Sequence, residues 1–104
     1  MNRIDVIVVG GGAAGLVAAG VAAKQGAQVL LLERNHRMAR KVMITGKGRC
    51  NITNNCSEES FLQHVCSNSK FLFGPIHRFP PQRTMAFLEE QGVPLKVERG
   101  NRVF

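Results

Sequence analysis

The chain has 104 residues, enough for one small domain at most. Apolar residues make up 44% of it and charged residues 20%, close to the averages of globular proteins, which excludes a disordered tail, a collagen-like repeat and a disulfide scaffold. The formal net charge of +7 favours an anionic partner, but the absence of Trp and Tyr leaves few rings to stack on nucleobases.

The N-terminal region contains an uncharged run, residues 6–23, that could be mistaken for a signal peptide or a membrane span. Its first half is rich in β-branched residues and its second half in Ala, with several glycines between them. A further apolar strand follows at once. These features predict a soluble βαβ unit, and we expect no membrane partner.

The βαβ unit is predicted as a strand, a tight turn, a helix and a second strand. Three consecutive apolar residues, 7–9, are typical of a parallel strand that is buried on both faces. Gly26 stands where many helices end. The predicted bounds are residues 4–9 for the first strand, 10–12 for the turn, 13–25 for the helix and 28–32 for the second strand.

The predicted turn carries the dinucleotide fingerprint GxGxxG. Gly10 permits a tight turn, Gly12 lets the backbone approach a pyrophosphate, and Gly15 allows the helix and strand to pack closely. The N-terminus of the following helix favours an anion, because its amide dipoles point towards it. We therefore predict a pyrophosphate site that also uses the backbone amides of Gly11, Gly12, Ala13 and Ala14.

The second strand ends in an acid, Glu33, 18 positions after Gly15. A carboxylate at this position accepts hydrogen bonds from the ribose hydroxyls of an adenosine and repels a 2′-phosphate, which disfavours NADP at this site. The adjacent Arg34 weakens that exclusion and is included among the predicted cofactor-binding residues. Both FAD and NAD fit this fingerprint.

Residues 35–55 are predicted to be mostly loop, in the region that holds the excess positive charge. Between Arg34 and Cys56 there is no acid, and the six cations are Arg34, Arg37, Arg40, Lys41, Lys47 and Arg49. Taken alone, this segment is either a solvated loop or a loop that faces a phosphate. A nicotinamide dehydrogenase usually continues into further βα units, whereas flavoproteins commonly run such a loop along an extended dinucleotide, so the loop favours FAD over NAD.

The rest of the chain is predicted to be helical with a C-terminal hairpin. Ser57 is a plausible N-cap, Gly74 and Pro75 are expected to stop a short helix, and the pair Gly100–Asn101 is expected to turn the hairpin. The predicted helices span residues 58–66, 70–73 and 81–91, and the hairpin strands span residues 95–98 and 102–104.

The three cysteines form no CxxC pair, which favours reduced thiols and a cytoplasmic protein. The spacing of Cys56, His64 and Cys66 matches no standard zinc pattern. We therefore predict no metal site.

Two stretches together resemble a known family. The first joins DVIVVGGGAAG, which begins at Asp5, to VLLLER, and the second is KVMITGKGRCNITN over residues 41–54. The sequence resembles the N-terminus of the bacterial NAD(P)/FAD-dependent oxidoreductases of the aminoacetone-oxidase-like flavoprotein family. The C-terminal stretch over residues 87–104 is also similar to that family, whereas Ala39 stands where the family often has Gly.

The resemblance implies a Rossmann-like FAD-binding βαβ unit of the glutathione-reductase type, here incomplete. It implies that the glycine turn holds the FAD pyrophosphate and that Glu33 holds the adenosine ribose. The flavin side of the cofactor would be lined by Lys41, Thr45, Gly46, Gly48, Arg49, Cys50 and Asn51. The implied activity is oxidoreduction of a small-molecule substrate by hydride transfer through flavin N5, with NAD(P) as a candidate electron donor.

Members of that family are several times longer than this chain. We expect residues 1–104 to be the N-terminal portion of a FAD-binding domain, with weak FAD binding and no turnover by itself. No catalytic residue is assigned, and no nucleic-acid partner is predicted. The alternatives are part of an NAD-dependent dehydrogenase, a basic nucleic-acid-binding module, and a remnant without catalytic function.

Overall fold

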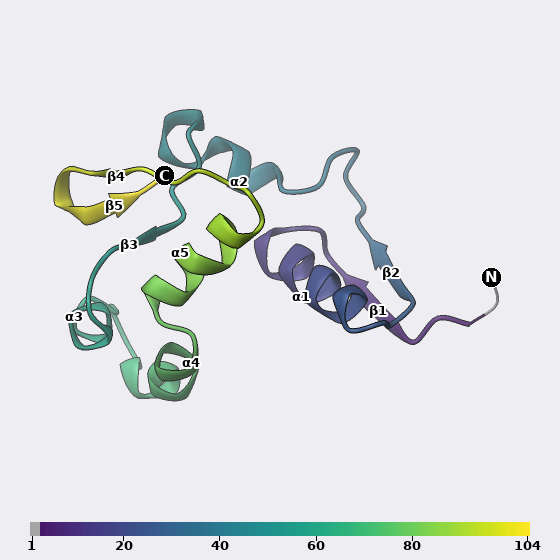
Figure 1. The fold of residues 1–104 in the computed structure, drawn as a ribbon, viewed down its shortest axis with the longest axis horizontal. Coiled ribbons are helices and arrows are strands. Elements are labelled where there is room, and N and C mark those ends of the chain that lie inside the picture. The colour runs from purple at the N-terminus through teal and green to yellow at the C-terminus, as the bar shows by residue number, and fades with distance from the viewer. Residues whose placement is uncertain (1–2) are drawn as a thin grey trace. The chain divides into compact units, whose positions relative to one another are not determined.

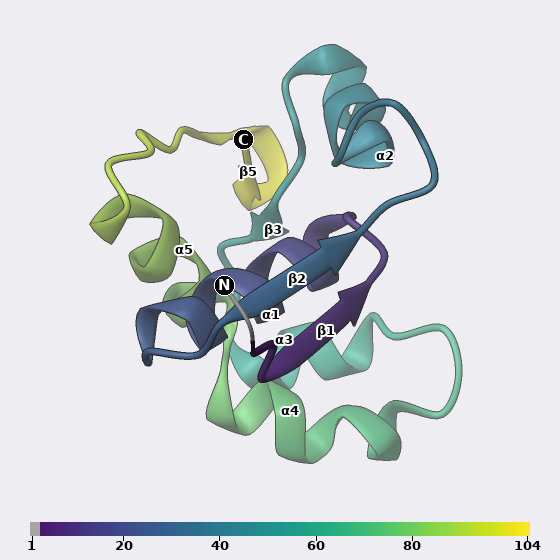
Figure 2. The ribbon, with the colours of Figure 1, turned by 90° about the vertical axis from the view of Figure 1, so that its right-hand side faces the viewer.

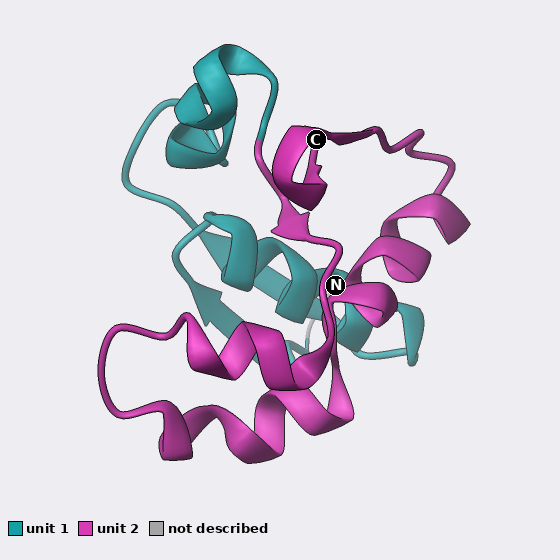
Figure 3. Ribbon diagram, turned by 90° about the vertical axis from the view of Figure 1, so that its left-hand side faces the viewer, with its two compact units in different colours: residues 1–50 teal, residues 51–104 magenta. Residues whose placement is uncertain are grey.

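The structure is a computed structural model that describes residues 3–104. The chain divides into two compact units, residues 1–50 and residues 51–104 (Figure 3). None of the helices within residues 3–104 is both long enough and apolar enough to cross a membrane.

The first unit is built on a βαβ motif, as predicted (Figure 1). Its elements are β1 (Val6–Val9), α1 (Ala13–Lys24) and β2 (Val29–Leu32). The two strands pair in parallel, with Val6 opposite Val29. Figure 2 shows α1 along one face of this pair, and Gly26 follows the helix with a positive φ of 96°. The Rossmann-like fold class is therefore confirmed.

The opposite face of the β1–β2 pair is exposed. Val9 keeps 83% of its surface accessible and Ile7 keeps 58%, and their partners across the pair, Leu30 and Leu32, are also exposed. Parallel strands are ordinarily covered on both faces, whereas only one face of this pair packs against α1.

The prediction that residues 35–55 are mostly loop is wrong for three short elements. These are α2 (Arg40–Ile44), the 3₁₀ turn η1 (Thr45–Gly48) and β3 (Thr53–Asn54). The residues of α2 include the good helix formers Arg, Lys and Met, but five residues are too few to display a helical period. β3 has no local signal, because its partner strand lies about fifty residues further along the chain.

Ala39 precedes α2 in the left-handed conformation, with φ 58° and ψ 33°. A Cβ is disfavoured there, so replacing Ala39 by Gly is expected to stabilise the protein by about 0.5–1 kcal/mol. Urea unfolding followed by circular dichroism measures the change. The matched control is Ala18→Gly in the middle of α1, which is expected to destabilise by about 1 kcal/mol. A destabilised Ala39→Gly variant would show that the left-handed conformation is not the native one.

The second unit contains short helices, of which the first two differ from the prediction. α3 (Glu58–Gln63) is capped as expected, because the Ser60 N–H donates to Ser57 Oγ at 3.1 Å, but it ends three residues early. A 3₁₀ turn, η2 (Ser69–Leu72), then leads directly into α4 (Phe73–Arg78).

The expected helix stop at Gly74 and Pro75 is wrong, because both residues lie inside α4. Pro75 is the third residue of that helix, in the first turn, where a backbone N–H has no partner within the helix. Proline is therefore tolerated at this position, and the helix begins where the sequence predicted that it would end.

The C-terminal part of the second unit is a helix followed by a small antiparallel sheet. Its elements are α5 (Pro81–Glu90), β4 (Val97–Glu98), η3 (Arg99–Asn101) and β5 (Arg102–Val103). The predicted hairpin is confirmed, and Gly100 and Asn101 both adopt positive φ at its turn. β3 adds to the hairpin in the order β3–β5–β4, and Val103 is fully buried.

Candidate dinucleotide site

The glycine turn between β1 and α1 brings the helix very close to the strand. Gly10 has a φ of 104°, and its N–H donates to the Leu32 carbonyl oxygen at 2.8 Å. A Cβ on Gly15 would collide with the carbonyl oxygen of Gly10 and lie 2.9 Å from its carbonyl carbon. Gly15 is therefore required for the close packing that the fingerprint predicts.

The N-terminus of α1 is open. Gly12 is its N-cap residue, no side chain caps the helix, and no acid lies in its first turn. A Cβ on Gly12 would meet no atom within 4 Å. The amides at this end have no acceptor within the helix and carry the positive end of its dipole, so the site fits a phosphate that approaches the backbone closely.

Glu33 lies beside this turn and is held by donors on both carboxylate oxygens. Its Oε1 accepts the Gly11 N–H at 2.8 Å, and its Oε2 accepts both the backbone N–H and the side-chain Nδ2–H of Asn35, each at 2.8 Å. The backbone N–H groups, that of Asn35 first and that of Gly11 second, lower the pKa of Glu33 below its ordinary value of 4.5. Glu33 is therefore ionised at neutral pH and oriented next to the turn.

The lowered pKa of Glu33 implies that the stability of the folded protein depends on pH. A carboxyl whose pKa is lower in the folded than in the unfolded protein stabilises the fold above its unfolded-state pKa. That contribution is lost as the pH falls through the folded-state pKa, which lies below 4.5. We expect wild type to exceed Glu33→Gln in melting temperature at pH 7 and the difference to shrink below pH 4.5. A difference that is constant from pH 7 to pH 3 would contradict the assigned hydrogen bonds.

The loop after Glu33 folds back onto the same glycine turn. The Ala39 N–H donates to the Gly11 carbonyl oxygen at 2.7 Å. Gly11 is buried, and a Cβ on it would lie 3.0 Å from Met38 Cγ. Both backbone groups of Gly11 are thus engaged within the protein, its N–H by Glu33 and its carbonyl by Ala39.

The chain matches the description "HI0933-like protein Rossmann domain" over residues 4–104. It belongs to the HI0933-like family. A 3-dehydro-bile acid delta(4,6)-reductase of Clostridium scindens is 36% identical over 106 aligned positions, covering 100% of the chain and 25% of that protein. A ribosomal RNA dihydrouridine synthase of Escherichia coli is 31% identical over 93 positions, covering 89% of the chain and 23% of that protein.

The chain thus spans about a quarter of the length of the curated relatives it matches. A second ribosomal RNA dihydrouridine synthase, from Haemophilus influenzae, is 31% identical over 84% of the chain and 21% of its own length. The match confirms the resemblance to flavoprotein oxidoreductases and identifies residues 4–104 as a Rossmann nucleotide-binding domain of the HI0933-like family.

The remaining predicted site residues of this HI0933-like chain lie in three places. Arg34 follows Glu33 and lowers its pKa slightly through its charge. In the first unit, Lys41 lies in α2. The turn η1 contains Thr45, Gly46 and Gly48, and Arg49 and Cys50 follow this turn. Asn51 begins the second unit, where its Nδ2 donates to the Val103 carbonyl oxygen at 3.1 Å. Only the glycine turn, Glu33 and the loop to Ala39 are joined by the hydrogen bonds described above, and the role of residues 41–51 stays a prediction.

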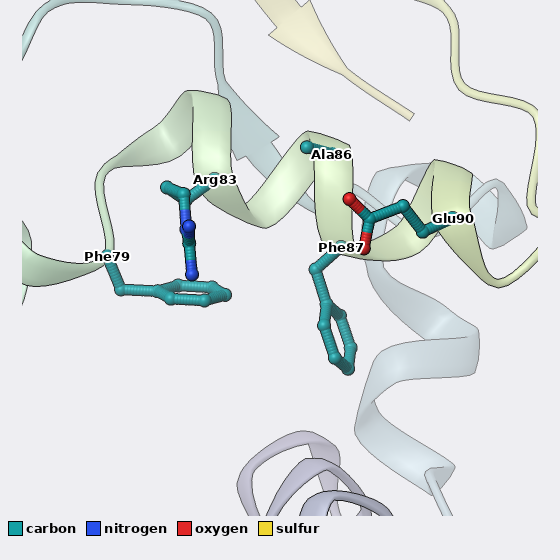
Figure 4. Close-up of a pocket in the computed structure, with 5 residues that line it drawn as sticks. All are labelled: Phe79, Arg83, Ala86, Phe87 and Glu90. Atoms are coloured by element: carbon teal, nitrogen blue, oxygen red, sulfur yellow. The ribbon is translucent and has the colours of Figure 1, made fainter.

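The second unit holds two hollows that the sequence did not indicate. Figure 4 shows the smaller one, on α5, where the Arg83 guanidinium lies 5.5 Å from the centre of the Phe79 ring. Phe79 also meets Phe87 edge to face, with ring centres 6.3 Å apart. In the larger hollow, lined in part by Cys56 and His64, the His64 Nδ1 lies 2.8 Å from the Ser60 carbonyl oxygen.

Sequence reasoning missed Asn35 in the HI0933-like site. Its side chain bridges two residues that the sequence did treat as important, since Nδ2 donates to Glu33 and Oδ1 accepts from Arg40 Nη1 at 3.1 Å. The available signal was an Asn two residues after the acid at a strand end, a place where Asn side chains often bond to nearby groups.

Proposed function

We propose that this chain binds the ADP half of FAD at the glycine turn and Glu33, as part of a flavin-dependent oxidoreductase. The observation that carries the proposal is the juxtaposition of an uncapped helix N-terminus with an oriented, ionised carboxylate. The helix N-terminus attracts a phosphate, and the carboxylate accepts a hydrogen bond from a hydroxyl. An adenosine diphosphate presents both groups.

Different residues would contact different parts of the cofactor. The amides of Gly12, Ala13 and Ala14 would hold the pyrophosphate, because the Gly11 N–H already donates to Glu33. Three donors already engage the Glu33 carboxylate, which offers about four lone-pair sites, so about one site, on Oε1, is left to accept a hydrogen bond from a ribose hydroxyl. Bound FAD would supply hydride transfer at N5. The flavin side is assigned to residues 41–51 through the family resemblance.

The names of the relatives suggest what such a flavin would reduce. One is named as a reductase of a bile acid and two as synthases of dihydrouridine in ribosomal RNA. Both kinds of name describe the addition of hydrogen to a substrate. We propose that the flavoprotein to which this domain contributes likewise delivers a hydride, from a nicotinamide donor by way of flavin, to an organic substrate.

RNA binding is a second candidate function, supported by the basic segment of the chain and by the names of two relatives. Two relatives are named for ribosomal RNA, and this chain carries a segment of six cations without an acid. Such a segment could contact a nucleic-acid backbone, against the prediction of no nucleic-acid partner. RNA binding with a steep dependence on salt, abolished by neutralising Arg37 and Lys47, would favour this function.

Flavin fluorescence anisotropy tests the proposed cofactor. We expect FAD anisotropy to rise on titration with the chain, and ADP to compete, since both carry the same ADP group. A 2′-phosphorylated ADP is expected to compete less well, because Glu33 repels the extra phosphate. Binding is expected to be too weak to survive desalting. FAD binding that ADP does not displace would contradict the assigned site.

A further inference from the structure

Asn35 connects the acid of the dinucleotide site to the basic helix α2. Its Nδ2 donates to Glu33 Oε2 at 2.8 Å, and its Oδ1 accepts from Arg40 Nη1 at 3.1 Å. A guanidinium only donates hydrogen bonds, so the amide oxygen must face Arg40 and the amide nitrogen must face Glu33. Arg40 thereby fixes which way the amide of Asn35 is turned.

The Glu33 carboxylate depends on this arrangement for its orientation. On one oxygen it has the Gly11 N–H, and on the other it has two donors from Asn35. No ion pair to Glu33 forms within residues 3–104, so hydrogen bonds rather than a direct cation hold it. Two donors from the backbone fix one direction each, and the side-chain amide is the third contact, which restrains rotation of the carboxylate plane.

We propose that Asn35 is a positioning residue for ribose recognition: it holds the Glu33 carboxylate in the orientation that accepts a hydrogen bond from the ribose 2′-hydroxyl. The inference rests on the proposed function, because it assumes that Glu33 reads the adenosine ribose. Asn35 itself would not touch the nucleotide. Its effect would be seen in the preference for a ribose that carries its 2′-hydroxyl.

The experiment compares the binding of ADP and 2′-deoxy-ADP by isothermal titration calorimetry. For wild type we expect ADP to bind about five- to tenfold more tightly, which lies within the usual range for the net contribution of one hydrogen bond. Asn35→Ala keeps the backbone N–H of residue 35 and is expected to reduce this preference to about twofold or less. The matched control is Asn54→Ala, which removes a side-chain amide that donates to the Gly100 carbonyl in the second unit. It should keep the full preference.

A second pair of variants shows whether Asn35 acts through the carboxylate. In a Glu33→Gln background the preference for the 2′-hydroxyl should already be small, and adding Asn35→Ala should not lower it further. A further loss would overturn the positioning role. A wild-type preference that Asn35→Ala leaves intact would overturn it as well. If wild type itself shows no preference, the assignment of Glu33 to the ribose fails, and the role of Asn35 fails with it.

Discussion

Replacing Gly15 by Ala is expected to destabilise the first unit by at least about 3 kcal/mol. The added Cβ would collide with the carbonyl oxygen of Gly10, which is a backbone atom in the turn itself. A flexible side chain could move aside, but here α1 must separate from β1 or the turn must change its shape. Either change also disturbs the amides that face the proposed pyrophosphate.

The matched control for this variant lies on the same helix. Gly20 is exposed, and a Cβ there would meet nothing within 4 Å. Gly20→Ala is therefore expected to raise stability by about 0.5–1 kcal/mol, because Ala is a better helix former than Gly. Thermal and urea unfolding of the two variants should move in opposite directions. Similar small effects from both would show that α1 does not approach the strand as closely as described.

Replacing Gly12 by Ser is expected to separate ligand binding from stability. The site has open space for a side chain, and Ser is a good N-cap residue, so stability should stay constant or rise by about 0.5 kcal/mol. The new hydroxyl, however, would occupy the place where a pyrophosphate must approach the backbone. Its oxygen would also accept a hydrogen bond from one of the backbone N–H groups that the pyrophosphate needs. We expect the affinity for ADP to fall by about tenfold or more.

Calorimetric titration with ADP measures the affinity of the Gly12→Ser variant, and thermal unfolding of the same sample measures its stability. Gly20→Ala again serves as the control, since it changes α1 away from its N-terminus and should leave ADP affinity unaltered. A Gly12→Ser variant that is stable and binds ADP as tightly as wild type would place the phosphate elsewhere.

The βαβ unit was predictable from local patterns. Consecutive apolar residues marked β1 and β2, and the glycine spacing marked the turn and the start of α1. The position of Glu33 at the end of β2 also followed from its spacing. These features lie close together in the sequence, and each has a direct physical reason to occur where it does.

Other features depend on contacts that no local pattern reveals. β3 is two residues long and exists because β5 pairs with it from the far end of the second unit. α2 is too short to show a helical period. The return of the loop to Gly11 also joins residues distant in the sequence, through the hydrogen bond from the Ala39 N–H to the Gly11 carbonyl, and Ala39 adopts a left-handed backbone there that few residues favour.

The proposed role of the glycine turn and Glu33 is to bind the ADP group of a flavin cofactor. The most direct test is an ADP titration of the ¹⁵N-labelled chain followed by nuclear magnetic resonance. The largest shifts are predicted at the amides of Gly12, Ala13 and Ala14, with further shifts at Glu33 and Asn35, because these groups surround the proposed diphosphate and ribose positions. Saturable shifts confined to the second unit, or no shifts at millimolar ADP, would contradict the claim.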